Sequence, residues 1–322
     1  KTFKETKVPV EIKEDEGPIV EPTFKAWWGV PDMPKMNLKN EGARKWALDV
    51  TEYWIKNFDI DGWRMDVAKE LDFSFWKDFR DIAIKTKKDV VLISEIFGDT
   101  SQWLQGDRFD GTMNYSFRET MIDYFATKRI DNKEFANSLS NLYSMYSFEA
   151  LSACQNLLSS HDVRRFLNQC ESNTDGIFGA VFLQATFPGI AGIYYGDEIG
   201  VGGGGDPFNR EPFPWDSEEK WNKDLMNFTS ELMNIKANEP VLKYGNFQMV
   251  NFDDNYVIFR RKFENESFLC IVNRDKQNVE ISIETPAQNV ESVYGECELE
   301  ISSGTLKISG LADNFGLIIK EN

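Results

Sequence analysis

Short apolar segments alternate with amphipathic helical segments between residues 41 and 240, and this alternation limits the possible folds more than any other feature of the sequence. Helical periodicity extends over residues 41–58 and again over about 72–87. The strand-like segments DGWRMD and VVLISEI follow them, and VVLISEI is nearly all apolar, as is typical of a parallel strand buried on both faces. This order predicts a right-handed parallel α/β architecture.

The same pattern continues further along the chain. We expect a short strand near FDGTMNY, helices between about 116 and 150, a strand at 150–159 (ALSACQNLLS), a helix at about 174–187, a strand at GIAGIYYG and a helix at about 217–238. Three tryptophans at helical spacing, Trp46, Trp54 and Trp76, are interpreted as core residues rather than as sugar platforms.

The two ends of the chain have a different character. Five prolines in residues 1–40 prevent a long helix and predict a lead-in of loops and short extended pieces. After residue 240, segments such as NYVIFRRKF and FGLIIK alternate apolar and polar residues between Asn, Asp and Gly turns. We therefore expect a lead-in over 1–40, an α/β part over 41–240 and a small antiparallel β domain over 241–322.

The charge balance excludes several classes of partner. Asp and Glu number 53 against 36 Lys and Arg, and the resulting net charge of -17 repels nucleic-acid phosphates and anionic lipid. No segment reaches the roughly 18 to 20 uncharged apolar residues that are needed to span a bilayer. The sequence therefore predicts neither a nucleic-acid partner nor a membrane partner.

The cysteines and the single histidine argue against a metal site. Four cysteines are widely spaced, form no CxxC pair and share the chain with one histidine, so a zinc cage is not expected. The interpretation is that the cysteines are reduced and structural, in a cytoplasmic protein with no metal and no cofactor.

Acidic residues stand where strands end. Asp66 follows GWRM, Glu95 follows VLIS, and His161-Asp162 follows LLSS. The carboxyl ends of parallel strands meet on one face, so these side chains can point into one pocket. Two carboxylates about 5 to 5.5 Å apart are the minimum machinery for cleaving a glycoside with retention, although each acid taken alone could be a cap or a solvated turn. Arg64 alternates to the face of Asp66 and could pair with it, or the two could form a purely structural ion pair.

Four segments and one short motif resemble the α-amylase family of glycoside hydrolases. GWRMDVAKE, SEIFGD, LLSSHD and GIYYGDEIG are similar to consecutive signature segments of that family. MPKMN, at residues 33–37, is similar to the extra segment of its neopullulanase, cyclomaltodextrinase and maltogenic amylase branch. The resemblance covers essentially the whole chain and implies an α/β fold: the C-terminal part of a (β/α)8 barrel followed by a small antiparallel β-sandwich domain.

The resemblance also implies a role for each matching residue. Asp66 matches the nucleophile, Glu95 the general acid/base and Asp162 the aspartate that stabilises the transition state. Arg64 and His161 match residues that orient the nucleophile and bind the sugar in the -1 subsite. The implied substrates are α-1,4-linked glucans: cyclodextrins, pullulan or malto-oligosaccharides.

Three further substrate-binding candidates follow from a comparison with the branch pattern. Glu70 follows the branch, whereas Lys69 stands where the branch usually has Asn. Phe97-Gly98 stands where the branch usually has Trp-His, which keeps a stacking ring but removes an indole donor and a side chain near the acceptor sugars. The loop with the four-glycine run lacks the GK[ST] ending of a phosphate loop, and in the family it places Arg210 and Trp215 at the rim of the site.

The barrel that the resemblance implies is incomplete in this sequence. Eight strands are needed to close it, residues 41–200 supply only about five, and the first signature segment of the family is missing. The chain opens with Lys1 rather than Met, so we expect a piece of a longer protein. An N-terminal part of the same enzyme or a homo-oligomer is the expected partner. Hydrolysis, transglycosylation and a non-catalytic carbohydrate-binding or assembly subunit with a relic site remain alternatives.

Overall fold

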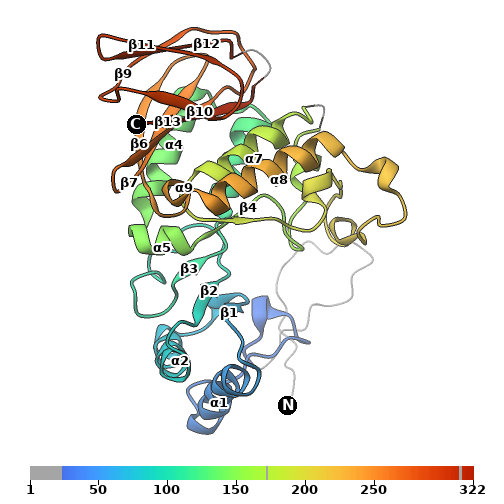
Figure 1. Ribbon diagram of the computed structural model, residues 1–322. Helices are drawn as coiled ribbons and strands as arrows, with labels where there is room; N and C mark the ends of the chain where they lie inside the picture. Colours follow the sequence, from blue (N-terminus) through green and yellow to red (C-terminus); the bar gives the residue numbers. More distant parts are fainter. Residues whose placement is uncertain (1–23, 172, 312–313) are drawn as a thin grey trace. The chain divides into compact units, whose positions relative to one another are not determined.

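The computed structural model describes residues 24–171, 173–311 and 314–322 (Figure 1). The chain forms two compact units, residues 1–92 and residues 93–322. The division falls inside strand β2 (Val91–Ser94), so each unit contains two residues of that strand. Residues 1–23 of the predicted lead-in lie outside the described residues.

Two helices and one short strand are the main elements of the described part of the first unit, residues 24–92. In chain order its elements are the 3₁₀ turn η1 (Trp27–Gly29), helix α1 (Glu41–Phe58), strand β1 (Gly62–Met65), the 3₁₀ turn η2 (Ala68–Glu70) and helix α2 (Phe73–Thr86). Asn40 caps α1 by accepting a hydrogen bond from the Ala43 amide, and Asp72 caps α2 by accepting one from the Ser74 amide. Both helices and the strand lie where the sequence predicts them.

The start of β2 lies directly beside β1. The Val91 amide donates to the Asp61 carbonyl at 2.9 Å. A Cβ at Gly62 would lie only 2.3 Å from the Val91 carbonyl oxygen, so this close approach of the two backbones requires glycine.

One face of α1 carries aromatic side chains that remain largely exposed. Trp46 is 59% exposed and Trp54 is 42% exposed, and Tyr53 and Phe58 are also exposed. The rings of Tyr53, Trp54 and Phe58 contact one another, with the Trp54 and Phe58 centroids 4.7 Å apart. The core interpretation is correct for Trp76, which is buried, and wrong for Trp46 and Trp54 among the described residues. Periodicity identifies an apolar face but not the group that covers it.

The first part of the second unit mixes short parallel strands with helices. After β2 come β3 (Gly111–Thr112), α3 (Tyr115–Met121), the π-helical turn η3 (Ile122–Ala126), α4 (Asn132–Met145), α5 (Phe148–Ala153), β4 (Gln155–Leu157), α6 (Phe166–Gln169), α7 (Gly176–Thr186), β5 (Ile190–Gly192), the 3₁₀ turns η4 (Asp197–Ile199), η5 (Phe208–Arg210) and η6 (Glu218–Lys220), α8 (Lys223–Asn238) and α9 (Pro240–Tyr244). The end of β2 pairs in parallel with β3, and β4 pairs in parallel with β5. A parallel bridge between Met113 and Gln155 joins the two pairs, as expected of an α/β arrangement.

The strand that the sequence predicts over 150–159 is much shorter in the structure. Helix α5 extends to Ala153, and only Gln155–Leu157 forms a strand. Ser147 caps this helix by accepting a hydrogen bond from the Ala150 amide. The strand was predicted from the apolar run that begins at Ala150. Ser147 lies just before this run and caps a helix that extends into it, so the prediction was wrong.

Two antiparallel sheets follow α9. Their strands are β6 (Asn246–Phe252), β7 (Val257–Phe263), β8 (Glu266–Val272), β9 (Ile281–Glu284), β10 (Val290–Tyr294), β11 (Glu298–Ser302), β12 (Thr305–Ser309) and β13 (Gly316–Glu321). The five-stranded sheet has the order β10-β13-β8-β7-β6, and the three-stranded sheet has the order β11-β12-β9 (Figure 1).

The five-stranded sheet is buried on both faces. One face packs on the three-stranded sheet through a shared apolar core that includes Ile258, Leu269, Ile283 and Leu306. The other face packs on helices: the Phe247 ring lies 5.3 Å from that of Tyr143 in α4. Strand β8 is therefore almost continuously buried rather than alternating.

Two buried cations, Arg261 and Lys236, hold backbone carbonyls in the second unit. Arg261 of β7 is fully buried and donates to the Asn246, Thr186, Leu242 and Gly245 carbonyls.

Lys236 of α8 donates from Nζ to the Ala185 carbonyl at 3.1 Å and to the Phe187 carbonyl at 3.3 Å. Burial, reinforced by the nearby Arg261 guanidinium, lowers the pKa of Lys236 to about 7. Arg261 and Lys236 together therefore supply side-chain donors to six backbone carbonyls of the second unit.

We predict that Lys236 makes stability depend on pH. Between about pH 7 and pH 10.5 the unfolded lysine holds a proton that the folded lysine has released, so the free energy of unfolding rises with pH, by up to about 1.4 kcal/mol per unit. Below that range both states are protonated and the cost of burying the ammonium is fully present. Urea unfolding of the wild type and of Lys236→Met from about pH 6 to about pH 10 measures this difference.

The matched control is Lys223→Met. Lys223 is exposed and pairs with Glu218, so its removal should shift the unfolding curve equally at every pH in the range. If Lys236→Met also gave a constant difference from the wild type, the buried ammonium would not titrate as stated.

Candidate active site

Asp66 follows directly after β1, and its carboxylate pairs with Arg64 of the same strand. Arg64 Nη1 lies 2.7 Å from Asp66 Oδ1, because residues two apart on a strand point to the same face. The Asp66 side chain is 71% exposed, so the ion pair is solvated and adds little to the free energy of unfolding. Its main effect is to orient the Asp66 carboxylate. The structure brings together the two residues that the sequence predicts as partners.

The backbone turns sharply after Asp66. Val67 has φ 45° and ψ 45°, a left-handed conformation that is a genuine outlier for a β-branched residue. Trp76 of α2 fixes the following turn by donating from Nε1 to the Ala68 carbonyl at 2.8 Å. Strained residues of this kind are concentrated at functional sites, where the surrounding structure over-determines them.

Glu70 is held by a residue that sequence reasoning did not single out. Lys35 Nζ pairs with the Glu70 carboxylate and also donates to the Glu70 carbonyl at 3.3 Å. Lys35 lies in the MPKMN motif, so the structure connects two features that were each recognised as branch markers. Lys69, between Glu70 and the buried Ala68, is exposed.

Glu95 and Phe97 follow the end of β2 in the second unit. Glu95 is buried, whereas Phe97 is half exposed. The Phe97 ring stacks on the buried Tyr115 of α3, with centroids 3.8 Å apart and an interplanar angle of 18°. Tyr115 was missed in the sequence because it reads as an ordinary apolar position at the start of a helix.

His161 and Asp162 lie together on the loop after β4. His161 Nε2 is 3.1 Å from Asp162 Oδ2, and Arg210 Nη2 is 3.7 Å from Asp162 Oδ1. Arg210 Nε donates to the His161 carbonyl at 2.9 Å, so this predicted rim residue contacts the loop directly. Ser160 Oγ accepts a hydrogen bond from the Asp162 amide at 3.2 Å.

The Phe97 stack and the loop after β4 are connected. Tyr115 Oη lies 3.2 Å from Ser160 Oγ, and Ser160 Oγ also receives the Asp162 amide. The ring that supports Phe97 therefore also contacts the loop that carries His161 and Asp162.

The cysteines and acidic clusters show no second reactive centre in the described part of the chain. All four cysteines are free thiols, and burial raises the pKa of Cys154, Cys170 and Cys270 to about 12. Thiols with raised pKa values are poor nucleophiles. Among the residues described, no three His, Cys, Asp or Glu side chains gather as metal ligands do. No helix described here is long and apolar enough to cross a membrane.

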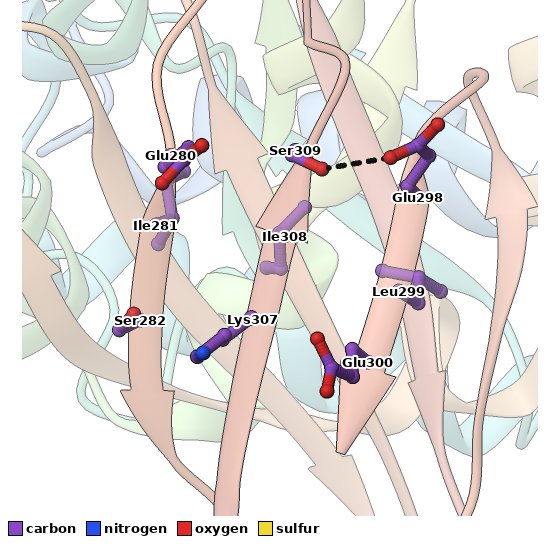
Figure 2. A pocket seen from close by; sticks show the side chains of 9 residues that line it. All are labelled: Glu280, Ile281, Ser282, Glu298, Leu299, Glu300, Lys307, Ile308 and Ser309. Carbon is purple, nitrogen blue, oxygen red and sulfur yellow. Dashed lines mark hydrogen bonds between the residues drawn. The ribbon is translucent and has the colours of Figure 1, made fainter. Parts of the chain in front are cut away.

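A separate hollow of about 430 Å³ lies on the outer face of the three-stranded sheet (Figure 2). Lys307 lies there between Ser282 and Glu300 of the neighbouring strands, Glu280 and Glu298 lie further along their strands, and the isoleucines and leucine of the same strands belong to the core face. Ser309 Oγ donates to Glu298 at 3.2 Å. The lining contains no aromatic ring on which a sugar could stack, so this hollow is a solvated acidic sheet face.

The comparisons with known proteins agree on one family. A family model described as "Alpha amylase, catalytic domain" matches residues 23–241. The chain is 37% identical over 269 residues to a cyclomaltodextrinase of Geobacillus thermopakistaniensis and 35% identical over 286 residues to neopullulanase 2 of Thermoactinomyces vulgaris. The match covers 83% and 87% of this chain, respectively.

Similarity to solved structures extends along the whole chain. The native form of the Nostoc punctiforme debranching enzyme is 27% identical with a TM-score of 0.86, and the match covers 99% of this chain and 69% of that one. This chain spans about half the length of the curated relatives that it matches, 46% of the cyclomaltodextrinase and 48% of the neopullulanase.

We predict that Tyr115 stabilises the second unit through both its ring and its hydroxyl. Tyr115→Phe should keep the stack on Phe97 and lose only the contact with Ser160, which lowers the free energy of unfolding by about 0.5 to 1.5 kcal/mol. Tyr115→Ala removes a buried ring and should cost about 3 to 5 kcal/mol. Urea unfolding checks both values, with Phe97→Ala as the control that removes only the more exposed ring. Equal losses for the two Tyr115 variants would show that the ring packing contributes nothing.

Proposed function

Because this chain belongs to the α-amylase family of glycoside hydrolases, we propose that it carries the catalytic residues of a retaining enzyme that cleaves α-1,4-glucosidic bonds. The observation that most supports the proposal is that Asp66 and Glu95, the two carboxylates of the matched motifs, directly follow the consecutive strands β1 and β2. The proposed substrates are cyclodextrins, pullulan or malto-oligosaccharides, in keeping with relatives named cyclomaltodextrinase and neopullulanase.

The proposed mechanism assigns opposite tasks to two acids. The Asp66 carboxylate attacks the anomeric carbon, while the Glu95 carboxyl group protonates the oxygen of the departing sugar. Glu95 then takes a proton from water, and the resulting attack on the anomeric carbon releases Asp66. The pairing of Asp66 with Arg64 supports the first task, since it holds the nucleophilic carboxylate in one direction. Burial of Glu95 supports the second, since it limits the access of bulk water to the carboxyl group that must protonate the departing oxygen.

Asp162 and His161 are proposed to bind the sugar in the -1 subsite. Their side chains are each partly exposed and lie 3.1 Å apart at His161 Nε2 and Asp162 Oδ2, so both can reach sugar hydroxyls. Hydrogen bonds that sugar hydroxyls donate to the Asp162 carboxylate would strengthen as positive charge develops on the sugar ring, which lowers the barrier. Phe97 supplies a ring face on the acceptor side, and Lys69 and Glu70 complete the proposed contacts.

We further propose that the chain contributes the later strands of a (β/α)8 barrel and a C-terminal β-sandwich domain. The N-terminal part of the same enzyme, or a second copy in a homo-oligomer, would complete the barrel. Two observations support this: the chain spans about half the length of its curated relatives, and aromatic residues of α1 remain exposed. The free cysteines support a cytoplasmic location.

We predict that Asp66→Asn abolishes turnover of β-cyclodextrin in the complemented protein. The substitution keeps the shape but removes the nucleophile, so kcat should fall by about 10⁴ or more. Glu95→Gln should retain measurable cleavage of aryl maltosides, whose leaving groups need no protonation. Proton NMR of the first-formed product should show the α-anomer, as retention requires.

The matched control for Asp66→Asn is Asp61→Asn. Asp61 precedes the same strand, is fully exposed and pairs with Lys87, so the identical chemical change there should leave kcat within about twofold. An Asp66→Asn protein with kcat within about tenfold of the wild type would exclude a covalent mechanism at this residue, and absence of turnover in the wild type would favour a binding subunit.

We also predict that residues 1–322 alone are nearly inactive and associate through the exposed aromatic face of α1. Light scattering should show species larger than a monomer, and Trp54→Glu with Phe58→Glu should shift them toward the monomer, because charged side chains oppose burial of that face. A cyclodextrin assay on the same samples measures activity. A stable and fully active monomer would contradict the proposed need for a complement.

A further inference from the structure

The loop from Leu158 to Arg164 presents its backbone carbonyls to buried side chains. Arg118 of α3 is buried and holds both ends: its Nε donates to the Leu158 carbonyl at 2.8 Å and its Nη2 to the Arg164 carbonyl at 3.0 Å. Both proposed sugar-binding residues, His161 and Asp162, lie between these two anchor points.

The middle of the same loop is held by one amide group, that of Asn209 in η5. Asn209 Nδ2 lies 2.8 Å from the His161 carbonyl, 2.9 Å from the Val163 carbonyl and 3.3 Å from the Ser160 carbonyl. An amide has two hydrogens, so three carbonyls share them. The Asn209 side chain is fully buried, and water cannot replace it as a donor there.

Asn209 is itself fixed by a rigid neighbour. The Arg165 guanidinium is completely buried, and its Nε donates to the Asn209 carbonyl at 3.1 Å. It lies over the Tyr194 ring at 4.2 Å and the Tyr195 ring at 4.7 Å, and Nη1 is 3.1 Å from Asp197 Oδ1. The amide that holds the loop therefore has little freedom to follow it if the loop moves.

The nitrogen and the oxygen of the Asn209 side-chain amide have very different hydrogen-bonding environments. Its Nδ2 serves three loop carbonyls, whereas its Oδ1 is buried and has no hydrogen-bond partner among the described residues. Turning the amide over would place Oδ1 against three carbonyl oxygens, which is unfavourable, so the orientation is determined by the loop. If only stability mattered, a side chain whose buried polar atoms all have hydrogen-bond partners would be favoured at this position.

We propose that Asn209 is a positioning residue: its amide fixes the backbone of residues 160–163 and thereby the direction of the Asp162 carboxylate and the His161 imidazole. The functional part of this inference rests on the proposed function, which assigns those two side chains to sugar binding. Asn209 is fully buried, so it has no surface open to a substrate and acts through the loop. Arg210, the next residue, adds a contact from its Nε to the His161 carbonyl.

The single histidine of the chain makes the proposal testable without an activity assay. Residues 1–322 contain one histidine, so protein labelled with ¹³C in the histidine ring gives one set of ring signals per chain, and these report on His161 alone. We expect Asn209→Ala to shift and broaden those signals. We also expect the Asp162 and Val163 amides to exchange with deuterium at least about tenfold faster, because the loop has lost its central donor.

The matched control is Asn273→Ala. Asn273 is also fully buried, and its Nδ2 donates to the Gln277 and Leu311 carbonyls in the β-strand part of the chain. Its removal should lower Tm without changing the His161 signals or the exchange of the Asp162 amide. Unchanged His161 signals in Asn209→Ala would overturn the proposal. If Asn209→Ala does not fold, Asn209→Ser, which keeps one donor, is measured instead. Shifted His161 signals in that variant would support the proposal, and unchanged signals would overturn it.

Kinetics on β-cyclodextrin in the complemented protein separate positioning from the proposed function. A displaced Asp162 should lower kcat by about 10- to 100-fold while KM changes by less than about threefold. If the wild type has no turnover, the proposed function fails and the His161 signals still decide whether Asn209 holds the loop. If the wild type is active and Asn209→Ala has normal kcat, the positioning role fails and the proposed function stands.

Discussion

Backbone carbonyls at the ends of very short strands need donors from side chains, and much of the second unit depends on how this need is met. Strands β3, β4 and β5 have only two or three residues each, so most of the chain around them has no ladder partner. Buried arginines supply the donors: Arg118 and Arg165 near the loop after β4, and Arg261 at the five-stranded sheet. An unmet carbonyl in such a place costs about 1 to 3 kcal/mol, so these cations are structural requirements.

Hydrogen bonds from buried cations to backbone carbonyls also connect distant parts of the second unit. Arg261 bonds to the carbonyls of Thr186 at the end of α7, Leu242 in α9 and Asn246 in β6, which fixes three chain segments around one guanidinium. Lys236 of α8 does the same for Ala185 and Phe187. Because each buried head group donates to backbone carbonyls, loss of any one segment would leave a buried donor without its acceptor. The helices and the five-stranded sheet of this unit are therefore expected to unfold together.

The sequence predicted the elements whose signal is local and failed where the signal is long-range. Helices α1 and α2 have clear apolar periodicity and lie where they were predicted, α7 was found as a long apolar segment, and α8 begins at Lys223, about six residues later than predicted. The segment around Ala150 was misread because an apolar run of that length fits either a buried strand or a buried helix.

The sequence likewise predicted some residues of the candidate site and missed others. Strand-end residues such as Asp66 and Glu95 could be found from the position of the strands and from motif similarity. Lys35, Tyr115 and Asn209 could not, because each acts through a contact with a residue at least 35 positions away.

Phe97-Gly98 differs from the pattern that we expect for the family, and the backbone conformation at Gly98 is consistent with this difference. Gly98 has φ 85°, a left-handed conformation that side chains other than glycine rarely adopt, although no atom would obstruct a Cβ there. A histidine at this position would therefore favour a different path for the chain after Glu95, and with it a different direction for the ring at position 97. In this protein that ring stacks on Tyr115, whose hydroxyl contacts Ser160 beside His161. The glycine thus fits an arrangement in which the Phe97 ring, proposed to lie on the acceptor side, and the proposed sugar-binding loop both contact Tyr115, and substitutions at Gly98 are expected to affect both.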